Sequence, residues 1–174
     1  MNKAFLVVMM AGSLVAMANM AHASDGTVKF TGSITDDACV VDPSSSNQTV
    51  PLGTVSAKSF TAAGDTSSAQ KFDIKLTGCP EGTVAVVFGG ATDSANADLL
   101  ALDSGMTAAG VGVRINNAED GSQVKLNDTT SATRVTVAAD GSATMHYVGQ
   151  YQSTVALVTA GTADATSQFT VLYN

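Results

Sequence analysis

The sequence of 174 residues has no tryptophan, two cysteines, three prolines and two histidines, and only 13% of its residues are charged. Basic residues are the scarcer sign: eight Lys and Arg stand against fifteen Asp and Glu, for a net charge of −7. Proteins that bind nucleic acid neutralise phosphates with clustered basic side chains, so we expect no nucleic acid partner. Disorder requires low hydrophobicity with high net charge, and 45% hydrophobic residues argue against it. The length fits one folded domain.

Groups that could support catalysis or metal binding are also few. His146 is the one histidine beyond the N-terminal segment, and it alternates away from the apolar face of a strand-like run, so we expect a surface residue. Asp93, Asn96 and Asp98 place oxygen atoms in one loop, but they lack the spacing and the glycine of a calcium-binding loop. No Ser–His–Asp arrangement or pair of catalytic carboxylates can be assembled. We therefore expect no enzyme, no cofactor and no metal.

Residues 1–23 carry the features of a secretory signal peptide. Lys3 provides a positive start, a long apolar run follows, and a small-x-small pattern ends at Ala23, so we expect cleavage between Ala23 and Ser24. A membrane anchor is the alternative, but it needs about 20 strongly apolar residues, and glycine, serine and asparagine interrupt this run. No later segment approaches that length, so we expect no membrane span in the exported chain.

The two cysteines, Cys39 and Cys79, fit an exported protein. In an oxidising compartment two cysteines in one domain form a disulfide, and we predict this pairing. Closing the loop between them would remove chain entropy worth about 4 kcal/mol from the unfolded state. Metal binding is the alternative, but two isolated thiols without a neighbouring histidine provide only half of a zinc site.

Beyond the signal peptide the dominant pattern is an alternation of apolar and polar residues, which is typical of half-buried strands. The alternating runs lie at residues 28–34, 72–76, 84–88, 111–115, 124–126, 135–137, 145–151 and 169–173. Turn-forming residues separate them at 42–47, 78–82, 116–121 and 139–142. The single helix-like stretch is short, at residues 95–102. Many short strands with turns between them predict an all-β sandwich.

Seven segments carry a more specific signal, because they occur together and in one order. They read GTVKFTGSI at 26–34, DACVV at 37–41, TVPLGTV at 49–55, FDIKLTGC at 72–79, NADLLAL at 96–102, GVGVRI at 110–115 and ADATSQFTVLYN at 163–174. In this order they resemble the pilin subunits of chaperone–usher fimbriae of the type 1-like kind, over essentially the whole exported chain. The cysteine pair, the penultimate tyrosine and the glycine-centred N-terminal segment carry most of the resemblance.

This resemblance implies a pilin fold, an incomplete immunoglobulin-like β-sandwich that is completed by a donor strand from another subunit or from a chaperone. It implies an N-terminal extension at residues 24–36 and a pilin domain at 37–174. A periplasmic chaperone first lends a strand, and the extension of the next subunit replaces it at an outer-membrane usher. The implied product is a fimbria on the cell surface that contributes to cell adhesion, with other pilin subunits as partners.

Matching the resemblance residue by residue assigns two groups of side chains. The donor strand, with its apolar residues and glycine on one face, comprises Val28, Phe30, Gly32 and Ile34. The C-terminal strand that binds the chaperone comprises Phe169, Val171, Tyr173 and Asn174. Either segment has a plainer interpretation, as an ordinary edge strand or an ordinary core strand of its own domain.

Two other functions stay open at this point. The short extension before Cys39 is compatible with a minor, adaptor or tip-proximal receptor-binding pilin as well as with a shaft subunit. A self-complete secreted β-sandwich that binds a ligand is the second alternative.

Overall fold

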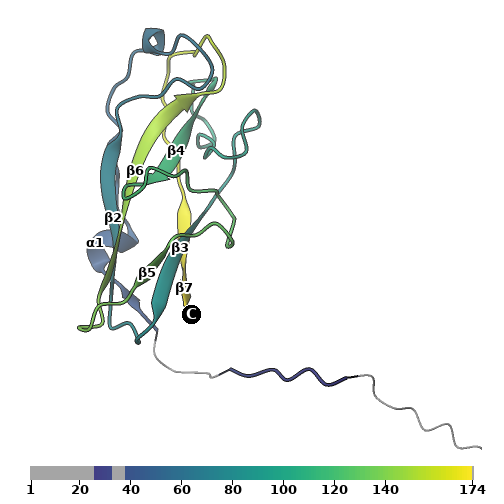
Figure 1. The fold of residues 1–174 in the computed structure, drawn as a ribbon. Helices are drawn as coiled ribbons and strands as arrows, with labels where there is room; N and C mark the ends of the chain where they lie inside the picture. The colour runs from purple at the N-terminus through teal and green to yellow at the C-terminus, as the bar shows by residue number, and fades with distance from the viewer. Residues whose placement is uncertain (1–25, 33–37, 174) are drawn as a thin grey trace, which may run out of the picture. The chain divides into compact units, whose positions relative to one another are not determined.

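The structure, a computed structural model, describes residues 26–32 and 38–173, which belong to two separate units. The first unit, Met1–Ile34, contributes residues 26–32, hereafter the arm, which carry no helix or strand. The second unit, Thr35–Asn174, carries every assigned element and is called the domain (Figure 1). The predicted cleavage site at Ala23 and Ser24 lies outside the described residues, as do Ile34 and Asn174.

The domain is built from seven antiparallel strands in two sheets, as the alternating pattern predicts (Figure 1). The first sheet has the order β1 (Val40–Val41), β2 (Gln70–Thr77), β6 (Ala143–Ser153) and β4 (Val111–Asn117). The second has the order β5 (Arg134–Thr136), β3 (Thr83–Gly89) and β7 (Gln168–Tyr173). Every pairing is antiparallel, and the prediction of an all-β sandwich is confirmed.

The core lies between the sheets and is formed by the apolar side chains that alternate with polar ones along each strand. Ile74 and Leu76 of β2 and Val84 of β3 are each 1% exposed. Phe88 packs edge-on against Tyr147 with the ring centroids 4.9 Å apart, an arrangement that aromatic rings prefer. Burial of Tyr147 raises the pKa of its hydroxyl to about 12, because the charged phenolate is poorly solvated there.

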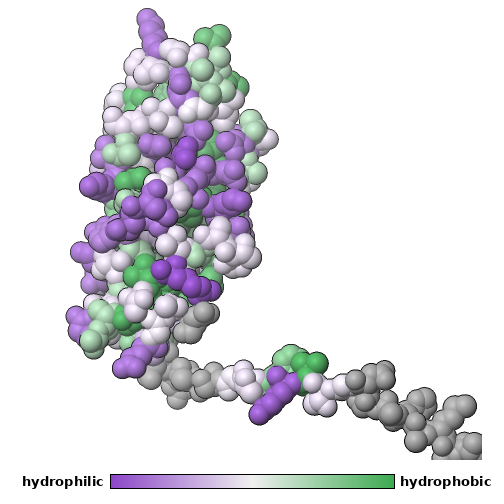
Figure 2. All heavy atoms as spheres, viewed as in Figure 1, coloured by the Kyte–Doolittle hydropathy of each residue, from purple (hydrophilic) through white to green (hydrophobic). Residues whose placement is uncertain are grey.

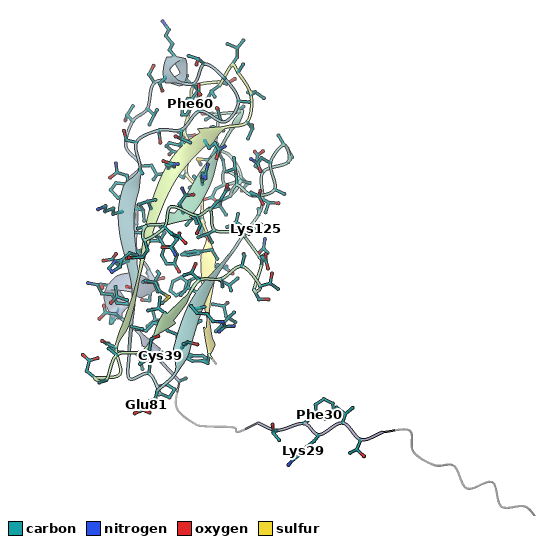
Figure 3. The ribbon with its side chains drawn as sticks, in the orientation of Figure 1. Lys29, Phe30, Cys39, Phe60, Glu81 and Lys125 are labelled. Carbon is teal, nitrogen blue, oxygen red and sulfur yellow. A yellow bond between two sulfur atoms is a disulfide. The ribbon has the colours of Figure 1, made fainter. Side chains whose placement is uncertain are left out.

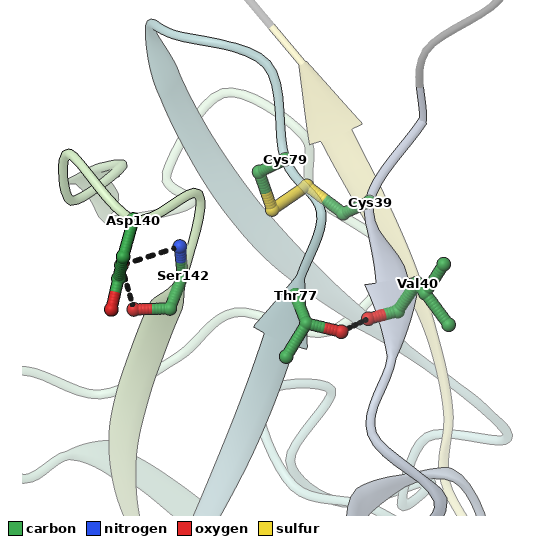
Figure 4. The surroundings of a disulfide bond; sticks show 6 residues. All are labelled: Cys39, Val40, Thr77, Cys79, Asp140 and Ser142. Atoms are coloured by element: carbon green, nitrogen blue, oxygen red, sulfur yellow. Dashed lines mark hydrogen bonds between the residues drawn. A yellow bond between two sulfur atoms is a disulfide. The ribbon is translucent and has the colours of Figure 1, made fainter.

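The two ends of the domain carry different features. At the end that we call the cysteine end, a disulfide joins Cys39 to Cys79, as predicted, beside the turn at residues 138–142 (Figure 4). β6 starts at this end and runs to Ser153 at the opposite end, called the far end. There the Ser153 carbonyl accepts the Gly64 N–H at 2.8 Å.

The helix expected at residues 95–102 is wrong, and a different segment is helical. The Asp93 side chain accepts the N–H groups of Ala95 and Asn96, so local turns satisfy groups that a helix would have used. Leu99 and Leu100 are buried instead against the start of β4.

Helix α1 (Pro43–Ser46) forms where a loop was expected. The Asp42 carboxylate accepts the Ser44 N–H at 2.8 Å, and Pro43 occupies the first helical position. Both features favour a helix start. A short 3-10 helix, η1 (Ala57–Ser59), lies at the far end. Residues 124–126 form no strand, although Val124 donates its N–H to Ile115 of β4.

Several turns are held by aspartate side chains that accept hydrogen bonds from their own turn. Asp140 is one example: its carboxylate accepts the Ser142 hydroxyl at 2.7 Å and the Ser142 N–H at 3.0 Å (Figure 4). These bonds, the hydroxyl first, lower the pKa of Asp140, because they favour the charged carboxylate. The same lowering occurs at Asp42, Asp65, Asp120 and Asp128.

We predict that these turns make the domain sensitive to acid. A carboxylate with a lowered native pKa binds fewer protons in the folded state, so its contribution is present above about pH 4 and is lost as the pH falls through the native value. Asp140→Asn, which cannot be protonated, should flatten the fall of the urea unfolding midpoint between about pH 4 and 2. Ser142→Ala should act in the same direction, and an unchanged pH profile in both variants would contradict the assignment.

Candidate functional site

The candidate site is the edge of β7 that faces away from β3. In the described part of the chain β7 pairs with β3 alone. Its six residues therefore leave one row of backbone N–H and C=O groups without a strand partner. An uncovered strand edge invites pairing with another chain unless something blocks it.

The other long edges of the sheets are covered by the protein's own chain. Beyond the two-residue β1, the edge of β2 is capped by α1, since the Lys75 N–H bonds to the Ser45 hydroxyl at 3.0 Å. That hydroxyl donates a hydrogen bond to the Asp73 carbonyl at 3.3 Å, and Ser45 is 2% exposed. On the outer edge of β4, Leu100 and Val113 exchange both backbone hydrogen bonds. By contrast, the β7 edge has six residues and no such cover among the described residues.

The side chains of β7 confirm that a neighbour is lacking on the core side. Phe169, Val171 and Tyr173 stand opposite Phe88, Val86 and Val84 of β3. The three β3 side chains are 4%, 2% and 1% exposed, whereas Phe169 and Val171 are half-buried and Tyr173 is 45% exposed. Paired residues on one face of a sheet lie in the same layer of the core. The greater exposure of the β7 side chains therefore arises on the flank that no described strand covers. We call this flank, with its three side chains, the β7 edge.

The arm has the complementary chemistry of an apolar strand without a sheet. Val28 is 76% exposed and Phe30 is 91% exposed. Lys29 and Phe30 project from opposite sides of the arm (Figure 3), which is the alternation of an extended chain. Gly32 lies in the same series, and a Cβ atom built on it would meet no other atom within 4 Å. Large apolar side chains this exposed are unusual in a soluble monomer and mark a contact surface.

The charged groups that the sequence analysis singled out do not assemble into a catalytic site. His146 is exposed, as expected, and its Nδ1 atom lies 2.7 Å from an Asp73 carboxylate oxygen on the outer face of the sheet. Asp93 caps its own turn, and the Asn96 side chain accepts the Asp98 N–H at 3.0 Å. Among residues 26–32 and 38–173, no group of three metal-binding side chains occurs, and no helix is long and apolar enough to cross a bilayer.

Two features of the surface escaped the sequence analysis. The first is Ser45, whose hydroxyl finishes the β2 edge; the preceding Asp-Pro pair was an available signal for a helix start. The second is a pair of exposed apolar side chains at the far end, Val155 and Leu157. No periodic pattern marks them, because they lie in a loop.

Comparison with known proteins supplies the context for this geometry. A family profile described as "Fimbrial protein" matches residues 28–174. A type-1 fimbrial protein subunit of Serratia marcescens is 40% identical over 171 residues, covering 92% of this chain and 93% of that protein. The antigen and type I fimbria protein of Burkholderia pseudomallei has a solved structure with 34% identity and a TM-score of 0.60, covering 85% of this chain and 97% of that one. The P pilus rod subunit PapA shares 25% identity with a TM-score of 0.63, covering 78% and 99%.

We predict that hydrogen exchange will reveal the β7 edge. In an antiparallel pair, alternate residues direct their N–H groups toward the one neighbouring strand. Every second β7 amide should therefore exchange about 100-fold faster than the amides that face β3. The central amides of β4, which has chain on both sides, serve as the internal control and should be uniformly protected. Uniform protection along β7 would show that its outer edge is already paired.

Proposed function

The chain belongs to the fimbrial protein family, and from this membership we propose that it is a structural subunit that polymerises by donor-strand exchange. The relatives are subunits of surface fimbriae with an incomplete immunoglobulin-like sandwich, which matches the expected fold. The observation that carries the proposal is the match between two surfaces of one chain. The β7 edge lacks a strand, and the arm is an alternating apolar segment without a sheet.

The donor segment is long enough to cover the β7 edge, and its apolar residues have the period of a strand. The arm and the residues after it, 27–35, span roughly 30 Å when extended, while the six residues of β7 span roughly 20 Å. Strand addition satisfies the free backbone groups of β7, and alternate side chains of the added strand then face the core. Val28 and Phe30 would enter the core side along the row formed by Phe169, Val171 and Tyr173. Gly32 would allow close backbone approach at one point.

The energy available from this exchange is large on the scale of a domain. Burying Val28, Phe30 and Ile34 contributes roughly 1.5–3 kcal/mol for each side chain, on the order of 5–9 kcal/mol before the cost of ordering the arm. An ordinary domain is stable by about 5–15 kcal/mol. Assembly can therefore proceed without a nucleotide, because each subunit gains a substantial part of its stability from its neighbour.

We extend the proposal to the route of assembly. Before polymerisation a periplasmic chaperone would occupy the β7 edge. It would contact Phe169, Val171 and Tyr173 and bind the main-chain carboxylate of Asn174. Exchange would then take place at an outer-membrane usher. The signal peptide proposed for residues 1–23 and the Cys39–Cys79 disulfide support passage through an oxidising compartment. The polymer would contribute to cell adhesion as part of a surface fimbria.

The donor role is tested by Gly32→Phe. Within the described residues, a Cβ atom at this position meets no other atom within 4 Å, so we expect the larger side chain to act on the neighbour. We expect fibre yield to drop at least about tenfold, because a bulky group blocks close approach to the acceptor, while the complex with the chaperone keeps its yield. Thr31→Phe, on the opposite side of the arm, is the matched control and should assemble. Normal fibres from Gly32→Phe would exclude the arm as donor.

The acceptor role is tested by Tyr173→Ser. Because Tyr173 is 45% exposed in the domain alone, its loss should affect a partner more than the domain's own core. The affinity of the chain for the chaperone should fall by about tenfold or more, because the contact of one large buried side chain is lost. Thr170→Ala, at an outward position on the same strand, should leave capture unchanged. Equal capture of both variants would count against the role of this edge.

A self-complete sandwich remains distinguishable by a simple experiment. If the β7 edge needs a strand from outside, the unmodified chain expressed in the periplasm without a chaperone should be degraded or aggregate. A stable monomer under these conditions would contradict the proposal.

A further inference from the structure

The far end of the domain carries an apolar loop that the proposed exchange of strands leaves unexplained. Among the described residues six large hydrophobic side chains are exposed. Val28 and Phe30 belong to the arm, and Tyr173 belongs to the β7 edge. Of the remaining three, Leu157 is 88% exposed and Val155 is 41% exposed, both in the loop at residues 154–158. Figure 2 shows hydrophobic groups among polar ones at this end of the domain.

The loop is fixed to the domain at both of its ends. The Thr154 N–H bonds to the Gly110 carbonyl at 2.9 Å, and Thr159 exchanges two backbone hydrogen bonds with Ala109. Gly110 has a φ of 76°, and a Cβ atom there would collide with Val155. The loop therefore holds Leu157 in contact with solvent. This exposure is unfavourable, because transferring apolar surface into water costs free energy.

Chain direction determines which surface can reach this loop. β7 runs from Gln168, which pairs with Gly89, toward Tyr173 near the cysteine end. The arm is joined to its own domain at Ala38, also at the cysteine end. A donated arm parallel to β7 would thus bring the donor's cysteine end against the acceptor's cysteine end.

Parallel donation cannot extend a fibre, because the acceptor sends its own arm out from that same end. The preceding and the following subunit would then compete for one surface. Antiparallel donation separates the two junctions, as an open head-to-tail polymer requires. The arm then leaves the acceptor at the far end, beside the loop at residues 154–158.

We propose that Leu157 and Val155 pack against the cysteine end of the next copy of the chain and form a second contact at each junction. This inference rests on the proposed strand exchange and adds a surface to it. The cysteine end offers a matching partner: Val40 is 62% exposed, and Ala38, Ala138 and Ala139 are exposed around it. These small side chains leave room for a projecting leucine.

Charges at the two ends support the same pairing. Lys58 is exposed on η1 at the far end and makes no ion pair among the described residues. Glu81 and Asp140 are exposed at the cysteine end, and Figure 3 shows Glu81 and Cys39 at the end opposite Phe60. Asp65, a few residues after η1, is held by hydrogen bonds from Thr61 and Ala62. Opposite charges therefore meet across the junction, which favours this orientation.

The test compares Leu157→Asp with the matched variant Leu157→Met in full-length chains. Fibres of Leu157→Asp should dissociate about tenfold faster in denaturant than unmodified fibres, because a charge replaces a buried apolar contact. Leu157→Met keeps the apolar contact and should behave like the unmodified chain. Equal dissociation rates for all three fibres would overturn the proposal.

Two further measurements separate this contact from the exchange of strands. A synthetic peptide of residues 26–35 should displace the chaperone equally fast from the unmodified chain and from Leu157→Asp, because the β7 edge is the same in both. If the peptide displaces nothing and the unmodified chain forms no fibres, the proposed function itself fails and this inference falls with it.

A photoactivatable side chain at position 157 maps the neighbour directly. In assembled fibres it should cross-link to residues 38–41, 78–82 or 138–142 of the adjacent copy. The same group at Lys71, which is exposed near the start of β2 and lies opposite Val148 in the middle of β6, is the control and should not reach these segments. Cross-links from position 157 to other surfaces, or none between copies, would overturn the proposal.

Discussion

The structure depends on one unsatisfied constraint: among residues 26–32 and 38–173, β7 has a strand on one side only. A strand at the edge of a sheet leaves a row of backbone groups unpaired, and in a sandwich an uncovered edge can leave the core side chains beside it open to solvent. Here Phe169, Val171 and Tyr173 face the core but remain partly open to solvent, while the residues paired with them on β3 are buried. No strand in the described part of the domain covers this flank.

Among the described residues, the other long edges of the sheets are covered and the β7 edge is left open. Helix α1 closes the β2 edge through the Ser45 hydroxyl, and residues around Leu100 close the β4 edge. The disulfide fixes Cys39 beside β1, where the chain enters the domain from the arm. A single long open edge gives an incoming strand one place to bind, so assembly can be specific although the contacts along a strand are mostly made by backbone atoms.

Much of this architecture could be predicted from local patterns, and the failures have local causes too. Alternation between apolar and polar residues placed β2, β3, β4 and β6, because the period of two is a direct consequence of strand geometry. Asp-Gly pairs placed the turn at Asp140. The pattern failed at residues 95–102, where closely spaced leucines suggested a helix although their burial comes from β4. It also failed at Leu157, since exposure of an apolar residue in a loop has no periodic signature.

The sequence by itself determined the chemistry of the parts: a cysteine pair, strands of alternating residues and an arm with the same alternation. Only the tertiary structure decided which edge stays open, because every strand carries the same backbone groups and only packing establishes which of them find partners. It also decided that Ser45 covers one edge and that Leu157 projects from the end opposite the disulfide. Those outcomes depend on contacts between residues far apart in the chain, which no local pattern records.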